Sequence, residues 1–538
     1  MENGVISTAQ PEATETGALV LMAGGNAIDA GIAAALVQGV VDPLMCGLGG
    51  VGTAMVHVPE QGPPENFNFL GAAPEAAASD IWADRILGET GDGFGFILKD
   101  NVNALGHQSA MVPGNLAGYW AMHQAHGRLD WAQLCQHAIR AARDGWMVRP
   151  HVYSYATQDE GALGRVHNSD ILGFTQEGRS LYISDAGAMH RPGQIIRNPG
   201  LAKALELIAQ EGADALYRGA IGQVLVEDMK ANGGLITRDD LENYAVSRDA
   251  ALRGTYRGYD IATNQPGGSG VQVLQTLNIL EQFDLAADFL LRSPEYIALL
   301  AEALGYAYND KRTRVGDPAF VDVPLQALLD KDYAAQLARQ IRAGEKAQLK
   351  RMSQPKESTE TTHVAVFDKD GNAFSMTHTL GAPSGIIPPG TGFILNGCMS
   401  IFDPRPGRPT SIMPGKSYTS SMSPTLIFKG GEPYLVIGAP GATYIPQAIA
   451  QAIVHCIDYG LSISDAIAAP RVAVTQNQRI DLSNRIPRYV EADLQARGYE
   501  TLRSFQSHAF AGVHGIKIEH GVAAGAADPG RDGMALIV

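Results

Sequence analysis

Residues 360–368 read Glu-Thr-Thr-His-Val-Ala-Val-Phe-Asp, a run that places two hydroxyl side chains at the head of an alternating apolar segment. A threonine hydroxyl is a poor nucleophile at neutral pH unless a base lies beside it. If the peptide bond between Glu360 and Thr361 is cut, Thr361 gains an α-amino group with an ordinary pKa of about 7.7–8.0. That amine lies within reach of the threonine's own side-chain oxygen. One residue would then supply both nucleophile and base.

A predicted β-hairpin must position this threonine. Residues 361–368 and 373–380 favour extended structure, and Asp370-Gly371 between them is a turn signal. The hairpin therefore carries Thr361 and Thr379 at the same outer end. An isolated Thr-Thr-His would more often belong to an edge hairpin with surface threonines, so the motif alone does not decide between structure and chemistry.

The stretch at Thr361 resembles the γ-glutamyltranspeptidase family of N-terminal nucleophile hydrolases, whose precursors cut themselves before a Thr-Thr-His. The resemblance covers nearly the whole chain, which makes chance a poor explanation. The other landmarks, in family order, are Ala23-Gly-Gly-Asn-Ala-Ile-Asp-Ala30, Gly47-Leu-Gly-Gly50, Val112-Pro-Gly-Asn-Leu-Ala-Gly118, Gln265-Pro-Gly-Gly-Ser-Gly270, Gly316-Asp-Pro318, Pro414-Gly-Lys416, Ser420-Ser-Met-Ser-Pro424, Gly438-Ala-Pro-Gly441 and Asp528-Pro529.

The resemblance implies an α/β fold of the αββα four-layer sandwich type. A cut before Thr361 would leave a large chain, residues 1–360, and a small chain, residues 361–538. The two chains are expected to stay together as a heterodimer that forms one structural unit, and its further dimerisation is left open. The polar segment 345–359 has little apolar periodicity, so we expect an exposed, mobile linker before the cut.

The resemblance also implies roles for individual side chains. Thr379 matches the family's threonine that hydrogen-bonds the nucleophile. Gly441-Ala442 matches a Gly-Gly pair whose N–H groups stabilise the oxyanion, and the alanine still donates its N–H. Ser420 and Ser421 match a serine pair that lines the acyl pocket. On their own, these residues would be interpreted as an ordinary strand threonine, a tight turn and loop hydroxyls.

Three positions depart from the family pattern. The family's arginine that holds the glutamyl carboxylate is Leu70 here, and the aspartate that holds the glutamyl amino group is Ile401. An asparagine two places after the hairpin threonine is Gly381. Because both ends of the glutamyl zwitterion lose their partners, the sequence indicates a retained catalytic apparatus and a rebuilt specificity pocket.

Two histidines near the hairpin ends, His363 and His378, suggest a serine-protease type of base. We prefer the terminal amine as the base and interpret both histidines as packed or solvated strand residues. No His, Asp or Glu cluster has metal-ligand spacing, so neither a metal nor another cofactor is expected.

Composition and charge narrow the classes of partner. The 538 residues carry a formal net charge of −15, which argues against nucleic acid and against an anionic membrane surface. The apolar stretch at 32–41 is too short to span a bilayer. The first residues lack the basic and apolar regions of a secretory signal, so the expected location is the cytoplasm. The four scattered cysteines are expected to be small core residues.

The coarse pattern along the chain agrees with an α/β protein. Helices are expected at 11–22, 26–41, 201–210, 271–283 and 293–308, and they alternate with β-rich segments near 364, 425 and 435. Asn26, Thr237 and Ser462 are predicted helix caps. The glycines at 47–52 lack a phosphate-loop pattern, which favours tight backbone packing over nucleotide binding.

These observations favour a self-processing threonine amidohydrolase that forms an acyl-enzyme at Thr361. Relatives with rebuilt pockets include oxamate amidohydrolase and cephalosporin acylases, so the expected substrate is a small or acidic acyl amide, with Arg405 or Arg408 as a candidate carboxylate partner. The first alternative is a γ-glutamyltransferase or glutathione hydrolase in which Asp403 replaces the missing aspartate. The second is a non-catalytic binding protein on the same fold.

Overall fold

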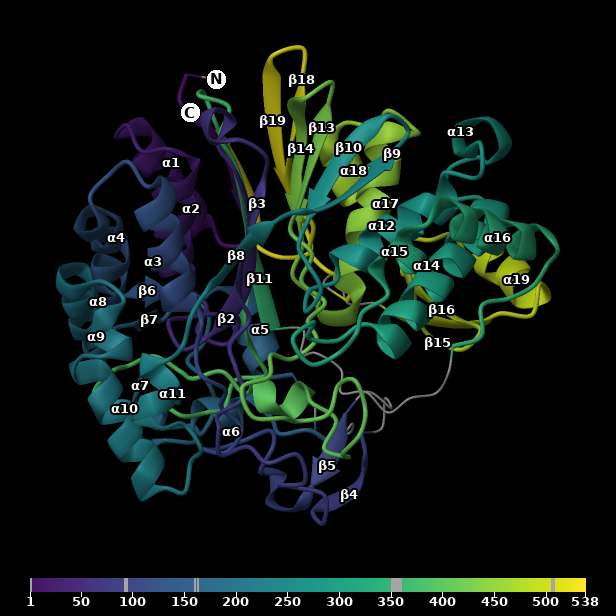
Figure 1. The fold of residues 1–538 in the computed structure, drawn as a ribbon. Coiled ribbons are helices and arrows are strands. Elements are labelled where there is room, and N and C mark those ends of the chain that lie inside the picture. The colour runs from purple at the N-terminus through teal and green to yellow at the C-terminus, as the bar shows by residue number, and fades with distance from the viewer. Residues whose placement is uncertain (1, 91–94, 159–160, 162–163, 350–359, 505–508) are drawn as a thin grey trace.

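The computed structural model describes residues 2–90, 95–158, 161, 164–349, 360–504 and 509–538. Two antiparallel sheets pack face to face, and helices cover the outer face of each sheet (Figure 1). The order of the layers is helix, sheet, sheet, helix. This is the αββα sandwich predicted from the sequence.

The predicted hairpin lies in the middle of the larger sheet. Its strands, β11 (Glu360–Asp368) and β12 (Ala373–Gly381), pair antiparallel with Thr362 opposite His378. Since both strands have partners on their outer sides, the surface-edge interpretation of the hairpin is wrong. The sheet has the order β20 (Met534–Ile537), β1 (Gly4–Thr8), β11, β12, β2 (Val51–His57), β3 (Glu65–Phe69) and β8 (Ser247–Ala250).

The second sheet supplies the opposite wall of the space between the sheets. Its strand order is β19 (Val522–Ala527), β18 (His514–Glu519), β14 (Glu432–Gly438), β13 (Thr425–Lys429), β10 (Tyr259–Thr263) and β9 (Leu252–Tyr256). Smaller sheets pair β4 (Ile86–Glu89) with β5 (Phe96–Leu98), β6 (Trp146–Met147) with β7 (Ile195–Ile196), and β16 (Arg479–Ser483) with β15 (Val472–Gln476) and β17 (Glu500–Ser504).

Each sheet has its own helical cover (Figure 1). Beside the larger sheet lie α1 (Pro11–Met22), α2 (Ala27–Val41), α3 (Asn115–His126), α4 (Trp131–Asp144) and α8 (Pro199–Glu211). Beside the second sheet lie α12 (Gly270–Leu280), α14 (Pro294–Arg314), α16 (Lys331–Arg342), α17 (Ile445–Ile457) and α18 (Ile463–Ala468). The remaining helices are α5 (Pro150–Ala156), α6 (Asn168–Leu172), α7 (Gln176–Tyr182), α9 (Asp214–Tyr217), α10 (Ala220–Ala231), α11 (Arg238–Glu242), α13 (Leu285–Asp288), α15 (Leu325–Leu329) and α19 (Arg488–Ala496).

The predicted caps explain where helices begin. Asn26 accepts hydrogen bonds from the N–H groups of Ile28 and Asp29, and the Asp29 carboxylate accepts from the Asn26 N–H. This reciprocal box satisfies N–H groups that the first turn of α2 cannot pair internally. Thr237 caps α11 in the same way, and Ser462 accepts from the N–H of Asp465 at the start of α18.

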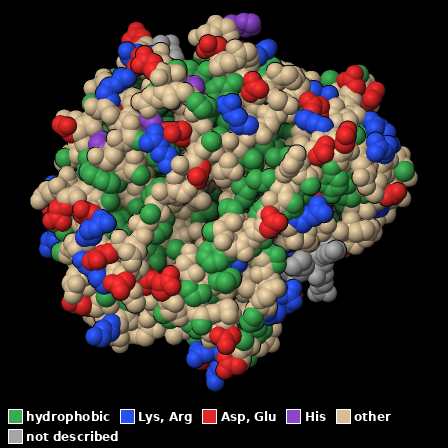
Figure 2. All heavy atoms as spheres, in the orientation of Figure 1, with side chains coloured by type: hydrophobic (Ala, Val, Ile, Leu, Met, Phe, Trp, Pro, Cys, Tyr) green, Lys and Arg blue, Asp and Glu red, His purple; other side chains and the backbone are tan. Residues whose placement is uncertain are grey.

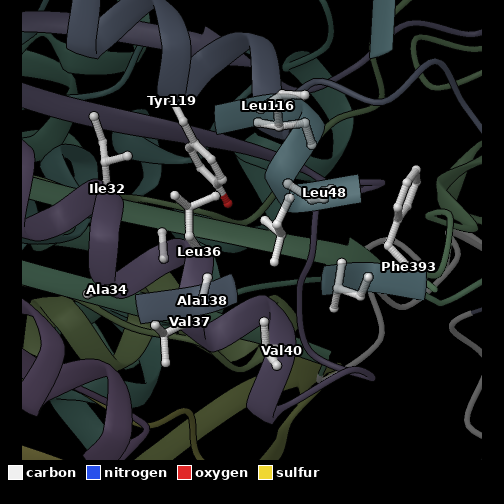
Figure 3. Close-up of a cluster of buried hydrophobic side chains, with 14 of the residues drawn as sticks. Ile32, Ala34, Leu36, Val37, Val40, Leu48, Leu116, Tyr119, Ala138 and Phe393 are labelled. Carbon is white, nitrogen blue, oxygen red and sulfur yellow. The ribbon is translucent and has the colours of Figure 1, made fainter. Parts of the chain in front are cut away.

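Strand periodicity divides the core into layers. Val364 and Val366 of β11 pack against the helices, whereas Ala365 and Phe367 point into the space between the sheets. Because successive side chains of a strand alternate, one strand serves both cores. We call these sides the helix-facing side and the inter-sheet side. In the helix-facing core, the ring of Tyr119 lies among apolar side chains that include Leu36, Leu48 and Leu116 (Figure 3).

Other sequence expectations have mixed outcomes. Cys46, Cys135, Cys398 and Cys456 are buried, as predicted. The expectation of an exposed segment at 345–359 is wrong for Ala347 and Leu349, whose side chains are buried in an apolar core cluster and whose N–H groups donate to Glu302 and Asn477. Residues 350–359 of that segment lie outside the described ranges.

Two surface properties bear on partners. No helix in the described ranges combines the length and the apolar character that a membrane crossing requires. On the face shown in Figure 2, acidic and basic side chains are interspersed.

Candidate active site

The hydroxyl groups of Thr361 and Thr379 meet at the end of the hairpin. Thr361 is 4% exposed, and its Oγ1 donates to Thr379 Oγ1 at 3.2 Å. The N–H of Gly381 also donates to Thr379 Oγ1, at 2.8 Å. Thr379 is thus fixed by its own strand and in turn orients the Thr361 hydroxyl, as a nucleophile requires.

The backbone is irregular at the bond that is predicted to be cut. Glu360 pairs with Gly381 and Thr362 with His378, so two residues of β12 lie opposite the single residue Thr361. Such a bulge interrupts the ladder of backbone hydrogen bonds and redirects a side chain. The register of the ladder from Thr362 onward already places Thr379 opposite Thr361 on the inter-sheet side, and the bulge interrupts regular pairing immediately beyond that pair.

Among the hydrogen bonds that the structure describes, those of His363 and His378 go to groups other than the Thr361 hydroxyl. His363 Nδ1 lies 2.9 Å from Thr377 Oγ1, and Gly438 packs closely against the His363 ring. His378 faces the helices, where Nε2 donates to Gln38 Oε1 at 2.8 Å and Nδ1 accepts from the Tyr119 hydroxyl at 2.5 Å. Burial lowers the pKa of both imidazoles, that of His378 to about 3. Both rings are therefore neutral, packed side chains.

Gly438, which packs against the His363 ring, is followed in the chain by a tight turn at residues 440–442. Gly441 has φ +134°, and a Cβ at this position would lie 2.4 Å from the Ala511 Cα, so only glycine fits. Ala442 also has a left-handed backbone, with φ +55°, which costs a residue with a Cβ roughly 1 kcal/mol. The turn thus keeps the strained conformation of the expected oxyanion pair although one glycine is replaced.

The buried ion pair between Arg471 and Asp528 holds the segment that packs against this turn. Arg471 donates to the carbonyls of Phe510 and Ala511, at 3.1 and 2.9 Å, and pairs with Asp528. The N–H of Gly512 then donates to the Pro440 carbonyl at 2.9 Å. Asp528 belongs to a recognised landmark, but the role of Arg471 was missed because nothing near it in the sequence signals chemistry.

Ser420 and Ser421 lie in a buried loop that the glycine landmark at 265–270 holds. The Ser420 N–H donates to the Gly267 carbonyl at 2.6 Å, and Ser269 Oγ donates to the Ser420 carbonyl at 2.7 Å. Ser420 Oγ accepts from the N–H of Met422 at 3.1 Å. The backbone of the serine pair is therefore fixed, and the Ser421 carbonyl accepts from Ser423.

The three departures from the family pattern lie at packed, uncharged positions. Leu70 is buried against Gly267, whose carbonyl holds Ser420. Gly381 has φ +70°, and a Cβ there would lie 2.4 Å from Cys398 Sγ and 3.4 Å from Ile401 Cδ1. Cys398 therefore fills the space that a side chain at position 381 would need.

The charged residues in the loop after Ile401 form ion pairs with one another. Asp403 is fully buried and accepts from Arg405 Nε at 2.8 Å and Nη2 at 2.7 Å, a two-pronged pair. Arg408 Nε lies 3.4 Å from the same carboxylate. Asp403 is thus neutralised by its own loop, and the two arginines have a protein carboxylate between them.

The contact between Arg531 and the backbone of Thr361 was not predicted from the sequence. This buried guanidinium, from the segment between β19 and β20, donates from Nη1 to the carbonyl oxygen of Thr361 at 3.2 Å. It lies 170 positions away in the chain. Its proximity to the Asp528 landmark was the only available signal.

Among the residues that the structure describes, no group of three His, Cys, Asp or Glu side chains could hold a metal ion. The arrangement instead provides an oriented hydroxyl, a tight turn with backbone N–H groups and a fixed serine pair. An oriented hydroxyl and backbone N–H groups are the kinds of group that acyl transfer through a covalent intermediate requires.

Comparisons with known proteins agree with this chemistry. The family model described as Gamma-glutamyltranspeptidase matches residues 13–538. The chain is 37% identical over 516 residues to the Acylase ACY 1 proenzyme of Pseudomonas sp. (strain SE83), covering 93% of this chain and 88% of the relative. It is 33% identical over 488 residues to the Glutathione hydrolase proenzyme of Escherichia coli (strain K12), covering 87% and 80%.

A solved structure supports the fold over the full length. The crystal structure of cephalosporin acylase from Bacillus halodurans superposes with a TM-score of 0.87 and 27% identity, covering 99% of this chain and 96% of that chain. Both chains therefore share one architecture from end to end.

Proposed function

Because this chain belongs to the γ-glutamyltranspeptidase family and is a hydrolase of that family, we propose that it is a self-processing threonine amidohydrolase. In this proposal the chain cuts itself between Glu360 and Thr361, and the two products remain together as a heterodimer. The substrate is the amide of a small or acidic acyl group, such as an oxamate-like compound, and not a typical γ-glutamyl compound.

The proposed reaction uses the groups that the family resemblance assigns, once the cut has given Thr361 a free α-amino group. The free α-amino group of Thr361 takes the proton from Oγ1, which attacks the amide carbonyl. The N–H groups at Gly441 and Ala442 stabilise the tetrahedral oxyanion, and the protonated amine passes its proton to the leaving nitrogen. Water, deprotonated by the same amine, then attacks the acyl-enzyme, releases the acid and restores the Thr361 hydroxyl.

One observation carries the choice of substrate. The positions at which the family binds the charged ends of a glutamyl group are occupied by Leu70 and by the packed set Gly381, Cys398 and Ile401. A hydrogen bond to a charged group is worth about 1.5–3 kcal/mol, and about 1.4 kcal/mol is a factor of ten in rate. Losing two such contacts should lower kcat/KM for γ-glutamyl donors by roughly two to four powers of ten.

The test compares substrates on the processed protein. A γ-glutamyl anilide is assayed beside oxamate, small dicarboxylic monoamides and neutral acyl amides. We expect the γ-glutamyl donor to be turned over poorly and at least one of the others well. A γ-glutamyl kcat/KM of about 10⁴ M⁻¹s⁻¹ or more, with no turnover of the other amides, would reject the rebuilt-pocket proposal.

A gain of activity sharpens this test. The double variant Leu70→Arg/Ile401→Asp returns an arginine and an aspartate to the two positions. We expect it to raise γ-glutamyl turnover at least tenfold, while Leu70→Met, which conserves an apolar side chain, leaves that turnover unchanged. Glutathione hydrolysis by way of Asp403 is disfavoured because Arg405 and Arg408 already neutralise that carboxylate.

A further inference from the structure

Arg531 brings a buried positive charge to the residue that must act as a base. Its guanidinium is 2% exposed and contacts the Thr361 carbonyl, so the charge lies on the main chain of the proposed nucleophile. Burial lowers the pKa of Arg531, but guanidinium groups start so high that the side chain stays charged. The same Nη1 also lies 3.7 Å from Met45 Sδ.

Asp42 is a buried carboxyl group in the neighbourhood of this charge: burial raises its pKa, and the charges of Arg149 and Arg531 and a hydrogen bond from Gln10 oppose that rise. Asp42 follows α2, is buried, and accepts a hydrogen bond from Gln10 Nε2 through Oδ2 at 2.9 Å. Its Oδ1 has no hydrogen-bond partner among the described residues. The turn that begins at Asp42 borders the site, because the N–H of Met45 donates to the Asp42 carbonyl and the Met45 carbonyl accepts from Leu380.

We propose that the buried guanidinium of Arg531 keeps the α-amino group of processed Thr361 unprotonated at neutral pH, with Arg531 as the positioning residue and the nearby Asp42 as its moderator. The inference rests on the proposed function. An amine that serves as a base must be free of its proton, and an ordinary α-amino group, with a pKa of about 7.7–8.0, is mostly protonated at pH 7. Burial and a nearby like charge both favour the neutral amine.

The other titratable groups near Thr361 are neutral or paired with an opposite charge. His363, His378 and His514 are buried and neutral, since burial lowers the pKa of each. The remaining neighbours are tied into pairs or uncharged: Asp528 pairs with Arg471, Asp532 and Glu12 pair with Arg149, and Tyr155 and Cys46 are a phenol and a buried thiol. Arg531 is therefore the charge in direct contact with Thr361.

The test is the pH dependence of kcat/KM for the best substrate found above, measured on the processed enzyme. Arg531→Gln removes the charge, so the acid limb of the profile should move up by about one to two pH units. Arg531→Lys retains a charge and should move the limb by less than half as much. Asp42→Asn removes the moderator and should move the limb in the opposite direction, to lower pH.

The opposite shifts separate electrostatics from architecture. A merely structural role would lower activity at every pH and leave the limb in place, and that result, or equal shifts for Arg531→Gln and Arg531→Lys, would overturn the proposal. Arg143→Gln, at an exposed ion pair on α4, is the matched control and should leave the profile unchanged.

A second measurement remains available if the Arg531 variants fail to process and Asp42→Asn does process. The rate at which a small electrophile modifies the Thr361 α-amino group, followed by mass spectrometry against pH, reports its protonation in wild type and Asp42→Asn directly. A midpoint that does not fall in Asp42→Asn contradicts the proposal. If wild type shows no chain beginning at Thr361, the proposed function itself is wrong. If the variants are processed and active but their pH profiles of kcat/KM match that of wild type, only the electrostatic role of Arg531 and Asp42 is rejected.

Discussion

The two faces of the β11–β12 hairpin carry the same residue types in different surroundings. On the helix-facing side, Gln38 of α2 donates to Thr362 Oγ1 at 2.9 Å and accepts from His378. On the inter-sheet side, the Thr361 hydroxyl points at Thr379, next to a break in the strand ladder. Neighbouring threonines thus enter two different environments.

The difference shows how a strand separates support from chemistry. The helix-facing network continues from Gln38 to Gln10 at 2.6 Å and from Gln10 to Asp42 at 2.9 Å. A buried hydrogen-bond network in a low-dielectric core holds its members in place and makes their loss costly. The inter-sheet side instead presents a hydroxyl that a new amine can activate.

Removing the inter-sheet hydroxyl should have the largest effect. Thr361→Ala is expected to remain a single full-length chain without activity, because nucleophile and processing group are lost together. Intact mass after purification is the measurement. Thr361→Ser should still process, though more slowly, since only the methyl that restrains the rotamer is lost. Thr362→Ala is the matched control on the other face and should process; equal processing by Thr361→Ala would point to a contaminating protease.

The partner hydroxyl should come next. Thr379→Val preserves the shape of the side chain but removes the acceptor for Thr361 and for the Gly381 N–H. We expect processing and kcat to fall by roughly tenfold to a hundredfold, since a buried group that loses its hydrogen-bond partner costs about 1–3 kcal/mol. Time courses of chain cleavage measure the first and steady-state rates the second. Thr379→Ser should recover most of the loss, and a Thr379→Val protein with wild-type rates would exclude an orienting role.

Breaking the helix-facing network should affect stability more than activity. Gln38→Leu removes one buried hydrogen bond each from Thr362, His378 and Gln10, which should lower the free energy of unfolding by about 3 kcal/mol. Thermal unfolding measures this change. The kcat of the folded, processed fraction should stay within about tenfold of wild type. A fall as large as that of Thr379→Val would show that the two faces are not separable.

The smallest expected effect is a change in how the melting temperature depends on pH when His378 is replaced. The pKa of His378 is about 3 in the folded chain because of burial, against about 6.5 when unfolded. Below pH 6.5 the unfolded chain binds a proton that the folded chain does not, so this contribution to stability is present above pH 6.5 and is lost as the pH falls toward 3. His378→Gln should make the fall of the melting temperature between pH 6.5 and 4 less steep. His520→Gln, at an exposed turn, should leave the slope unchanged; the same slope in His378→Gln would contradict the assignment.

Much of the local structure could be predicted from the sequence. The hairpin, the caps at Asn26 and Thr237 and the helices at 11–22 and 27–41 were recognised because caps, turns and periodicity act over a few residues. Within 345–349, exposure was predicted incorrectly for Ala347 and Leu349, because their burial depends on partners far away in the chain.

The sequence by itself determined the class of chemistry and the fold: a threonine at the head of an alternating strand, glycine turns at fixed places and uncharged residues at positions 70 and 401. Only the tertiary structure decided which face of the strand each threonine occupies. It also decided that Cys398 fills the space beside Gly381 and that Arg531 reaches Thr361. The physical reason is range, since propensity and periodicity are local, whereas these contacts join segments that meet only when the sheets and helices pack.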